Sequence, residues 1–195
     1  MMISVLYIHG FNSSPQSMKA VLTRTFFTTR YPEVNFYCPQ VACSPNMVIA
    51  QLEGIIKQAP NSTWLIIGSS LGGYFATFLA EKYQLQAALI NPAVKPFDLM
   101  QDYLGEQVNP YTQERYSIAA KHIVELKMLE QNNISKNNYL VMVQTGDEVL
   151  DYQQAVEKYR HCQLVIEQGG DHSFINYETI LPNIALFFNL QSYSA

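Results

Sequence analysis

A serine between two glycines is the residue of this sequence best suited to chemistry. Gly68, Ser70 and Gly72 form a Gly-x-Ser-x-Gly pattern between the apolar run 63–67 and the run 71–80, whose apolar residues recur at helical spacing. A strand, a sharp turn with a serine and then a helix is the arrangement that exposes a nucleophilic hydroxyl at a helix N-terminus. The same pattern also fits a tight turn that uses small residues for backbone reasons alone.

A serine hydroxyl becomes a nucleophile only when a base takes its proton and an acid orients that base. Asp147 follows the apolar run 139–144, and His172 follows the run 163–167, so each lies beyond the carboxyl end of an expected strand. Sites in open parallel sheets form at those ends. We therefore predict a catalytic triad of Ser70, Asp147 and His172, in the chain order Ser, Asp, His.

Other residues compete for two of these roles. Asp171 adjoins the histidine in sequence, where neighbouring loop side chains tend to diverge, and Glu148 lies one residue further from the strand end than Asp147. His122 and His161 lie in helical or loop surroundings from which strand ends are hard to reach. An aspartate after a glycine and a lone histidine also have structural uses, as a turn former and as a capping or surface residue.

The negative charge that forms on an attacked carbonyl oxygen needs backbone N–H donors. One is expected from Leu71, which follows the candidate nucleophile. The other is expected from the segment His9-Gly10-Phe11, which follows the first apolar run and in which Gly10 permits a tight turn. We predict an oxyanion hole formed by the N–H groups of Phe11 and Leu71.

The elements that must position these residues alternate along the whole chain. Short apolar runs, nearly continuous as in strands buried on both faces of a parallel sheet, alternate with amphipathic segments, which predicts an α/β fold. In the last helical segment Pro182 is expected to break or restart the helix. The expected strands are 3–8, 34–38, 63–67, 87–90, 139–144 and 163–167, and the expected helices are 16–28, 45–58, 71–83, 152–159 and 174–190.

Residues 92–135 interrupt this alternation. Between Ile90 and Tyr139 we find no convincing strand, and the ranges 97–103 and 116–131 look helical around the turn-rich range 109–112. An insertion of this size after a strand is typical of a cap or lid, and a crossover packed on the sheet is the alternative.

Side chains of this insertion could form an apolar wall with polar tips, suited to a short acyl chain. Lys95 and Arg115 could meet an acidic leaving group such as coenzyme A. The candidates for the wall are Phe97, Leu99, Tyr103, Tyr111 and Tyr116, and the predicted substrate-pocket residues are His9, Tyr103, Tyr111 and Tyr116.

The composition excludes several classes of protein. With 195 residues, 48% hydrophobic and 14% charged, the chain suits one sizeable core and lacks the composition of a disordered segment. The net charge of −4 is scattered, so nothing favours nucleic acid or an anionic membrane as a partner. No apolar run approaches the roughly 20 residues of a membrane span, and the N-terminal run lacks the basic start of a signal peptide.

The three cysteines, Cys38, Cys43 and Cys162, are odd in number and have no metal-type spacing. They indicate reduced thiols and a cytoplasmic location. Cys43 could act as a nucleophile, but no residue near it in sequence supports that. No ligand spacing of histidine, cysteine or carboxylates is present, so we predict neither a metal nor a cofactor.

Taken together, these motifs resemble the α/β-hydrolase superfamily and, more closely, the small bacterial YqiA-like esterase family. The resemblance implies one α/β-hydrolase domain over 1–195 with the cap at about 92–135. It also implies about six parallel strands in the order 2-1-3-4-5-6, helices on both faces and a small helical cap. Asp151 stands near the place where larger relatives often carry a proline, which affects only the loop. The matching segments are 7–15, 68–73, 91–96, 109–112, 145–152 and 169–174.

The resemblance further implies hydrolysis of a small carboxylic ester or acyl thioester through an acyl-enzyme. Ser70 would be the nucleophile, His172 the base and Asp147 the orienting acid. The same triad on this fold also suits a lyase or an acyltransferase, and the scaffold could serve a non-catalytic binding protein. The sequence indicates neither the acyl group nor the oligomeric state.

Overall fold

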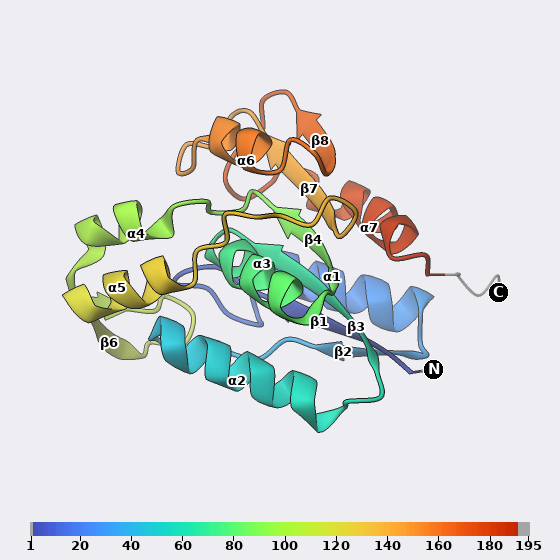
Figure 1. The fold of residues 1–195 in the computed structure, drawn as a ribbon, viewed down its shortest axis with the longest axis horizontal. Helices are drawn as coiled ribbons and strands as arrows, with labels where there is room; N and C mark the ends of the chain where they lie inside the picture. The colour runs from blue at the N-terminus through green and yellow to red at the C-terminus, as the bar shows by residue number, and fades with distance from the viewer. Residues whose placement is uncertain (1, 191–195) are drawn as a thin grey trace.

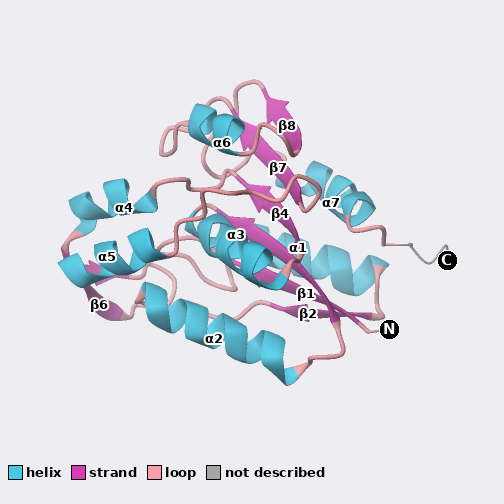
Figure 2. Ribbon diagram, viewed as in Figure 1, coloured by secondary structure: helices cyan, strands magenta, loops and turns pink. Residues whose placement is uncertain are grey.

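A six-stranded parallel sheet lies between two layers of helices in the computed structural model, which describes residues 2–190 (Figures 1 and 2). Counted along the chain, the six sheet strands have the predicted order 2-1-3-4-5-6, so the predicted fold class is confirmed. From one edge to the other the strands are β2 (Val34–Tyr37), β1 (Ile3–Ile8), β3 (Thr63–Ser69), β4 (Gln86–Ile90), β7 (Tyr139–Gln144) and β8 (Gln163–Glu167).

The central strands are apolar along their whole length because both faces of the sheet are covered. Leu6 and Ile66 enter the core on one face, while their neighbours Val5 and Leu65 enter the core on the other. All four side chains are almost completely excluded from solvent. This burial explains the continuous apolar runs of the sequence, since strands that alternate apolar and polar residues have one face exposed to solvent.

The helices divide between the two cores. Helices α2 (Pro45–Gln58), α3 (Leu71–Tyr83) and α6 (Tyr152–Lys158) contribute to the first core, and α1 (Met18–Arg30) and α7 (Leu181–Phe187) contribute to the second. A short 3-10 helix, η2 (Tyr177–Ile180), precedes α7, and Pro182 lies in the first turn of α7. Pro182 therefore restarts the helix where its missing N–H costs no hydrogen bond, as expected.

The insertion after β4 differs from the sequence prediction. It contains α4 (Pro96–Leu99), the 3-10 helix η1 (Met100–Tyr103), an antiparallel hairpin of β5 (Gly105–Val108) and β6 (Arg115–Ile118), and α5 (Ala120–Met128). The expectations of no strand here and of a helix from residue 116 were therefore wrong. Each hairpin strand has only four residues, too few for an alternating pattern to stand out from a helical one.

This insertion gathers beyond one end of the central sheet, where Figure 1 shows α4, α5 and β6 together. Asn109 closes the hairpin, because its Oδ1 accepts the N–H groups of Tyr111 and Thr112 at 2.9 and 3.2 Å. The turn-rich range of the sequence is therefore the tip of a hairpin. Within residues 2–190, no helix is long and apolar enough to cross a membrane.

Candidate active site

The side chains of Asp147, His172 and Ser70 form a continuous hydrogen-bonded row. His172 Nε2 lies 3.0 Å from Ser70 Oγ, and His172 Nδ1 lies 3.0 and 2.9 Å from the two carboxylate oxygens of Asp147. An ionised carboxylate only accepts hydrogen bonds, so Nδ1 carries the hydrogen and the Nε2 lone pair faces the serine hydroxyl. A histidine in this arrangement can take the proton of a serine.

Ser70 lies in a backbone conformation that L-residues rarely adopt. Its φ is 55° and its ψ is −124°, at the turn between β3 and α3. Such a conformation costs about 1–3 kcal/mol and persists only where the surroundings hold it. The helix after the turn packs tightly on β1, since a Cβ on Gly72 would lie 2.0 Å from the carbonyl oxygen of Ile8. The small residue of the motif is therefore required for packing as well as for the turn.

Asp147 lies in a loop that holds its carboxylate ionised. Its side chain is only 2% exposed. Burial alone would raise its pKa, but the hydrogen bond from His172 and those from the N–H groups of Leu150 and Val149 outweigh burial and lower the pKa below its usual value. Asp147 is therefore charged at neutral pH and able to stabilise a protonated imidazole.

The rival acids have other partners. Glu148 accepts the backbone N–H of His172 at 3.0 Å, and Asp171 accepts the hydroxyl of Ser173. Glu148 thus helps to hold the loop of His172, while Asp147 is the carboxylate that meets the imidazole ring.

The loop after β1 runs directly beside the serine. A Cβ on Gly10 would lie 3.1 Å from Ser70 Cβ and 3.5 Å from Ser70 Oγ, so the close approach depends on a glycine. Phe11 follows in the chain and lines the same cleft as Ser70 and Leu71. Leu71 is the first residue of α3, so its N–H has no acceptor within the helix. Both residues predicted to supply the oxyanion donors thus line the cleft of Ser70.

The side chain of His9 stabilises the loop after β1. Its side chain is 2% exposed, its Nδ1 donates to the carbonyl of Gly10 at 3.0 Å, and its Nε2 accepts the N–H of Val41 at 3.2 Å. Burial lowers the pKa of His9, and the hydrogen bond to Gly10 opposes this only in part. The ring is therefore neutral and joins the loop after β1 to the segment between β2 and α2.

Two buried amides that the sequence analysis did not single out hold the loop of His172. Gln144 ends β7, and its Oε1 accepts the N–H groups of Asp171 and Ile175 at 3.1 and 2.9 Å. Asn91 follows β4, and its Nδ2 donates to the carbonyl of Asp171 at 3.0 Å while its Oδ1 accepts the N–H of Gln144 at 2.9 Å. The loop of His172 is thus positioned from the ends of two neighbouring strands.

Lys19 reaches the same loop from α1. Its Nζ donates to the carbonyl oxygens of His172 and Ser173 at 3.3 and 2.8 Å. Burial lowers the pKa of Lys19 to about 8, although the carboxylates of Asp147 and Asp171 oppose the change. The backbone of the His172 loop is therefore also held by the ammonium group of Lys19.

Three hollows surround these residues. The first, the nucleophile cleft, has a volume of about 190 Å³ and opens over Ser70 and His172. The second, the Val149 groove, has a volume of about 250 Å³ and continues the cleft along Leu99, Val149 and Leu150. The third, the hairpin cavity, has a volume of about 60 Å³ and shares Phe11, Leu71 and Met100 with the cleft.

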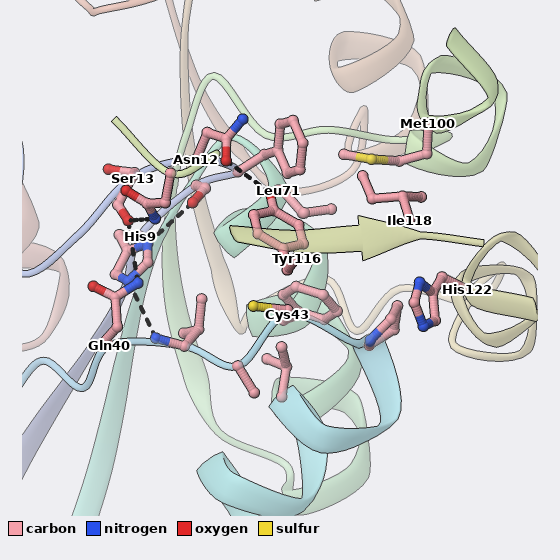
Figure 3. Close-up of a pocket in the computed structure, with 18 of the residues that line it drawn as sticks. His9, Asn12, Ser13, Gln40, Cys43, Leu71, Met100, Tyr116, Ile118 and His122 are labelled. Carbon is pink, nitrogen blue, oxygen red and sulfur yellow. Dashed lines mark hydrogen bonds between the residues drawn. The ribbon is translucent and has the colours of Figure 1, made fainter. Parts of the chain in front are cut away.

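The hairpin cavity is shown in Figure 3. Side chains of His9, Ser13 and Gln40 lie at one end in this view, and those of Ile118 and His122 lie at the other. The walls of the cavity come from the loop after β1, the segment between β2 and α2, helix α3 and the hairpin with its following helix.

The predicted pocket residues have different positions. Tyr103 lines the nucleophile cleft, and Tyr116 and His9 line the hairpin cavity. Tyr111 lines none of the three hollows and is 53% exposed at the hairpin tip. The structure thus does not bring Tyr111 into these hollows with the other predicted pocket residues, and its part in the pocket stays a prediction.

Of the two cations that could meet an acidic leaving group, only Lys95 borders a hollow, the Val149 groove. Arg115 lies on the exposed side of β6 and lines none of the three hollows.

Proteins of known sequence and structure share this organisation. A UPF0227 protein from Serratia proteamaculans is 26% identical over 188 residues, which cover 95% of this chain and 99% of the relative. Mouse α/β-hydrolase domain-containing protein 10 superposes with a TM-score of 0.74 at 16% identity, over 95% of this chain and 89% of its own. Monoacylglycerol lipase from Paleococcus ferrophilus superposes with a TM-score of 0.70 at 14% identity, over 94% of both chains.

At 16% and 14% identity, the two similar structures are evidence for the fold alone. They confirm the α/β-hydrolase fold that the sequence predicted. The family model reaches further, since it matches residues 4–189. The chain therefore belongs to UPF0227, an uncharacterised protein family, and it has the fold of the α/β-hydrolases.

Proposed function

We propose that the protein is a serine hydrolase that cleaves carboxylic esters, acyl thioesters included, through an acyl-enzyme on Ser70. The observation that carries this proposal is the row of Asp147, His172 and Ser70, with 2.9–3.0 Å between successive hydrogen-bonding atoms. The strained backbone at Ser70 adds support. A tight turn without a catalytic role needs neither a buried carboxylate nor an imidazole in line with the hydroxyl.

In the first half of the reaction, Nε2 of His172 takes the proton of Ser70 while Oγ attacks the carbonyl carbon of the ester. The electrons of the carbonyl double bond move to its oxygen, and the N–H groups of Phe11 and Leu71 stabilise the resulting negative charge. Asp147 keeps the proton on Nδ1 and stabilises the imidazolium.

In the second half, the imidazolium of His172 gives its proton to the leaving oxygen or sulfur, which departs and leaves an ester on Ser70. Water then attacks this ester and gives a proton to Nε2. When the second tetrahedral intermediate collapses, the acid is released and Oγ regains its proton. None of these steps calls for a metal or a redox cofactor.

We also propose that residues 92–135 form a cap on a single domain that spans the chain. The cap supplies Leu99, Met100 and Tyr103 to the nucleophile cleft, which supports a role in substrate binding. The monoacylglycerol lipase of the same fold supports a small-molecule ester as the substrate. A cytoplasmic location is supported by three cysteines without disulfides.

A fluorophosphonate probe tests the activated serine directly. We expect the folded protein to be labelled at Ser70 and to hydrolyse p-nitrophenyl acetate. Ser70→Ala should abolish labelling and lower kcat/KM by more than about a thousandfold. Ser173→Ala is the matched control, because Ser173 is an exposed serine next to His172, and it should remain labelled and active.

Two results would count against the proposal. Folded protein that is neither labelled nor active on small esters would favour the non-catalytic binding protein. Labelled protein that transfers the acyl group to an added alcohol and forms no free acid would identify an acyltransferase instead.

A further inference from the structure

The hairpin cavity has an apolar interior, although polar residues surround it. Its floor and sides are formed by Ala42, Val48, Phe75 and Leu126. Most of the polar side chains around them are hydrogen-bonded, to backbone groups or to one another, whereas the buried Gln40 Oε1 has no partner among the described residues. Tyr116 donates its hydroxyl to Asn12 at 2.6 Å, for example. A ligand in this cavity therefore meets mainly carbon, and the cavity selects an apolar group.

The position of the cavity relative to the base indicates which part of an ester would enter it. The leaving group must reach Nε2 of His172 to receive a proton, so it departs on the side of the nucleophile cleft that His172 lines. The Val149 groove continues the cleft on that side, next to the Asp147 loop. The hairpin cavity has no wall from residues 147–172 and adjoins the two oxyanion donors. Since the leaving group occupies the side of the Val149 groove, the hairpin cavity remains as the place for the acyl group.

The side chain of Phe11 forms the partition between cleft and cavity. Its ring makes edge contacts with Tyr103 on the cleft side, with ring centroids 5.2 Å apart, and with Tyr116 on the cavity side, at 6.5 Å. Leu71 and Met100 complete the shared wall. Phe11, whose N–H is a proposed oxyanion donor, therefore also separates the cleft from the cavity, and an acyl chain that enters the cavity must pass its ring.

We propose that the hairpin cavity is the acyl-chain site and that the protein hydrolyses esters of short, unbranched fatty acids. This inference rests on the proposed serine hydrolase activity. A cavity needs about 10–15 Å³ to admit even one water-sized group, so the volume of about 60 Å³ admits only a few groups of that size. The site therefore accepts a short acyl chain and excludes a long one.

The test compares p-nitrophenyl acetate, butyrate, hexanoate and decanoate, which share a leaving group. We expect the kcat/KM of the unmodified protein to rise about fourfold per methylene up to butyrate or hexanoate, since a buried methylene contributes about 0.8 kcal/mol and a factor of ten equals 1.36 kcal/mol. The value should then fall for decanoate, which exceeds the cavity.

Ala42→Phe fills the cavity from the segment between β2 and α2. The Ala42 N–H donates to Gln51 Oε1 at 3.1 Å, a backbone interaction that the substitution keeps. The ratio of hexanoate to acetate kcat/KM should fall at least about tenfold. Ala42→Leu, a smaller filling, should shorten the preferred chain by one or two carbons. Val124→Phe, at an exposed position of α5 that lines none of the three hollows, is the control and should keep the ranking of chain lengths.

The outcomes separate this inference from the proposed function. If acetate is hydrolysed in a Ser70-dependent way but Ala42→Phe and Ala42→Leu keep the chain-length ranking, the assignment of the cavity is wrong and the hydrolase remains. A preference of the unmodified protein for decanoate also overturns the assignment. If Ser70-dependent hydrolysis is absent for every ester, the proposed function itself fails.

Discussion

Replacing Gln144 by methionine would test how the proposed base is held in place. The Gln144 side chain makes four hydrogen bonds: to the N–H groups of Asp171 and Ile175, to the carbonyl of Ile175 and to the carboxylate of Glu167. The residue is only 3% exposed, so no water can take over these bonds without a rearrangement. Methionine has a similar length and shape and cannot reproduce them.

The expected effects follow from these bonds. Each hydrogen bond contributes about 0.5–1.5 kcal/mol net, and a buried group left unsatisfied costs about 1–3 kcal/mol. Since the loop of His172 can move outward and recover bonds with water, we expect Gln144→Met to lower the free energy of unfolding by about 2–4 kcal/mol. A shift of the imidazole by about 1 Å should lower kcat about a hundredfold with little change in KM.

Urea unfolding and ester hydrolysis, measured on the same preparation, give both quantities. The control is Gln153→Met, an exposed glutamine on α6, which should change neither. If Gln144→Met unfolds at the same urea concentration as the unmodified protein and keeps kcat within about twofold, the amide does not position the base. A loss of stability with full kcat would show that the loop of His172 is held by other contacts.

Three further predictions concern charge and packing. Since burial lowers the pKa of Lys19 to about 8 from 10.5, this residue binds more protons in the unfolded than in the native chain between these values, so the free energy of unfolding of the unmodified protein should rise with pH relative to that of Lys19→Met; urea midpoints of the two proteins that differ by a constant amount across this range would contradict the reasoning. Asp147→Asn should lower kcat about ten-thousandfold because the imidazole loses its orienting acceptor, whereas Asp171→Asn should stay within about threefold; the reverse order would contradict the assignment of the acid. Gly72→Ala should prevent folding, because its Cβ would overlap the backbone of β1, while circular dichroism should show Gly54→Ala, with nothing within 4 Å of the new Cβ, folded and slightly more stable.

The parts of the fold that the sequence predicted are those set by burial on both sides of the sheet. The helices 45–58 and 71–83 and the strands 139–144 and 163–167 have the predicted bounds, because apolar runs and their punctuation are local properties. The proximity of Ser70, Asp147 and His172 could also be predicted, because each residue follows a strand and the carboxyl ends of parallel strands lie on the same side of the sheet. Their distances could not be predicted, because these depend on loop conformations.

The hairpin and the two supporting amides could not be predicted in this way. Tyr116 and Ile118 do alternate with exposed Arg115 and Ser117, but two inward residues fit a helix equally well. Gln144 had a weak signal as the polar last residue of the apolar run 139–144. Its partners lie 23–31 positions away in sequence, and no spacing rule connects them.

The role of Asn91 follows from the place of β8 in the sheet. β8 is an edge strand, and all five of its residues are partly buried or exposed, so it can fix the loop that follows it less firmly than a central strand can. Asn91 compensates, since its side chain joins the end of β4 to Gln144 on β7 and to the carbonyl of Asp171 in the loop. In the sequence, an asparagine that follows a strand and precedes a proline, as Asn91 does, indicates only a turn. In the fold Asn91 has a φ of 40°, and its hydrogen bonds connect the inner strands β4 and β7 to the loop of His172. This loop follows the edge strand β8 and is therefore fixed from the interior of the sheet.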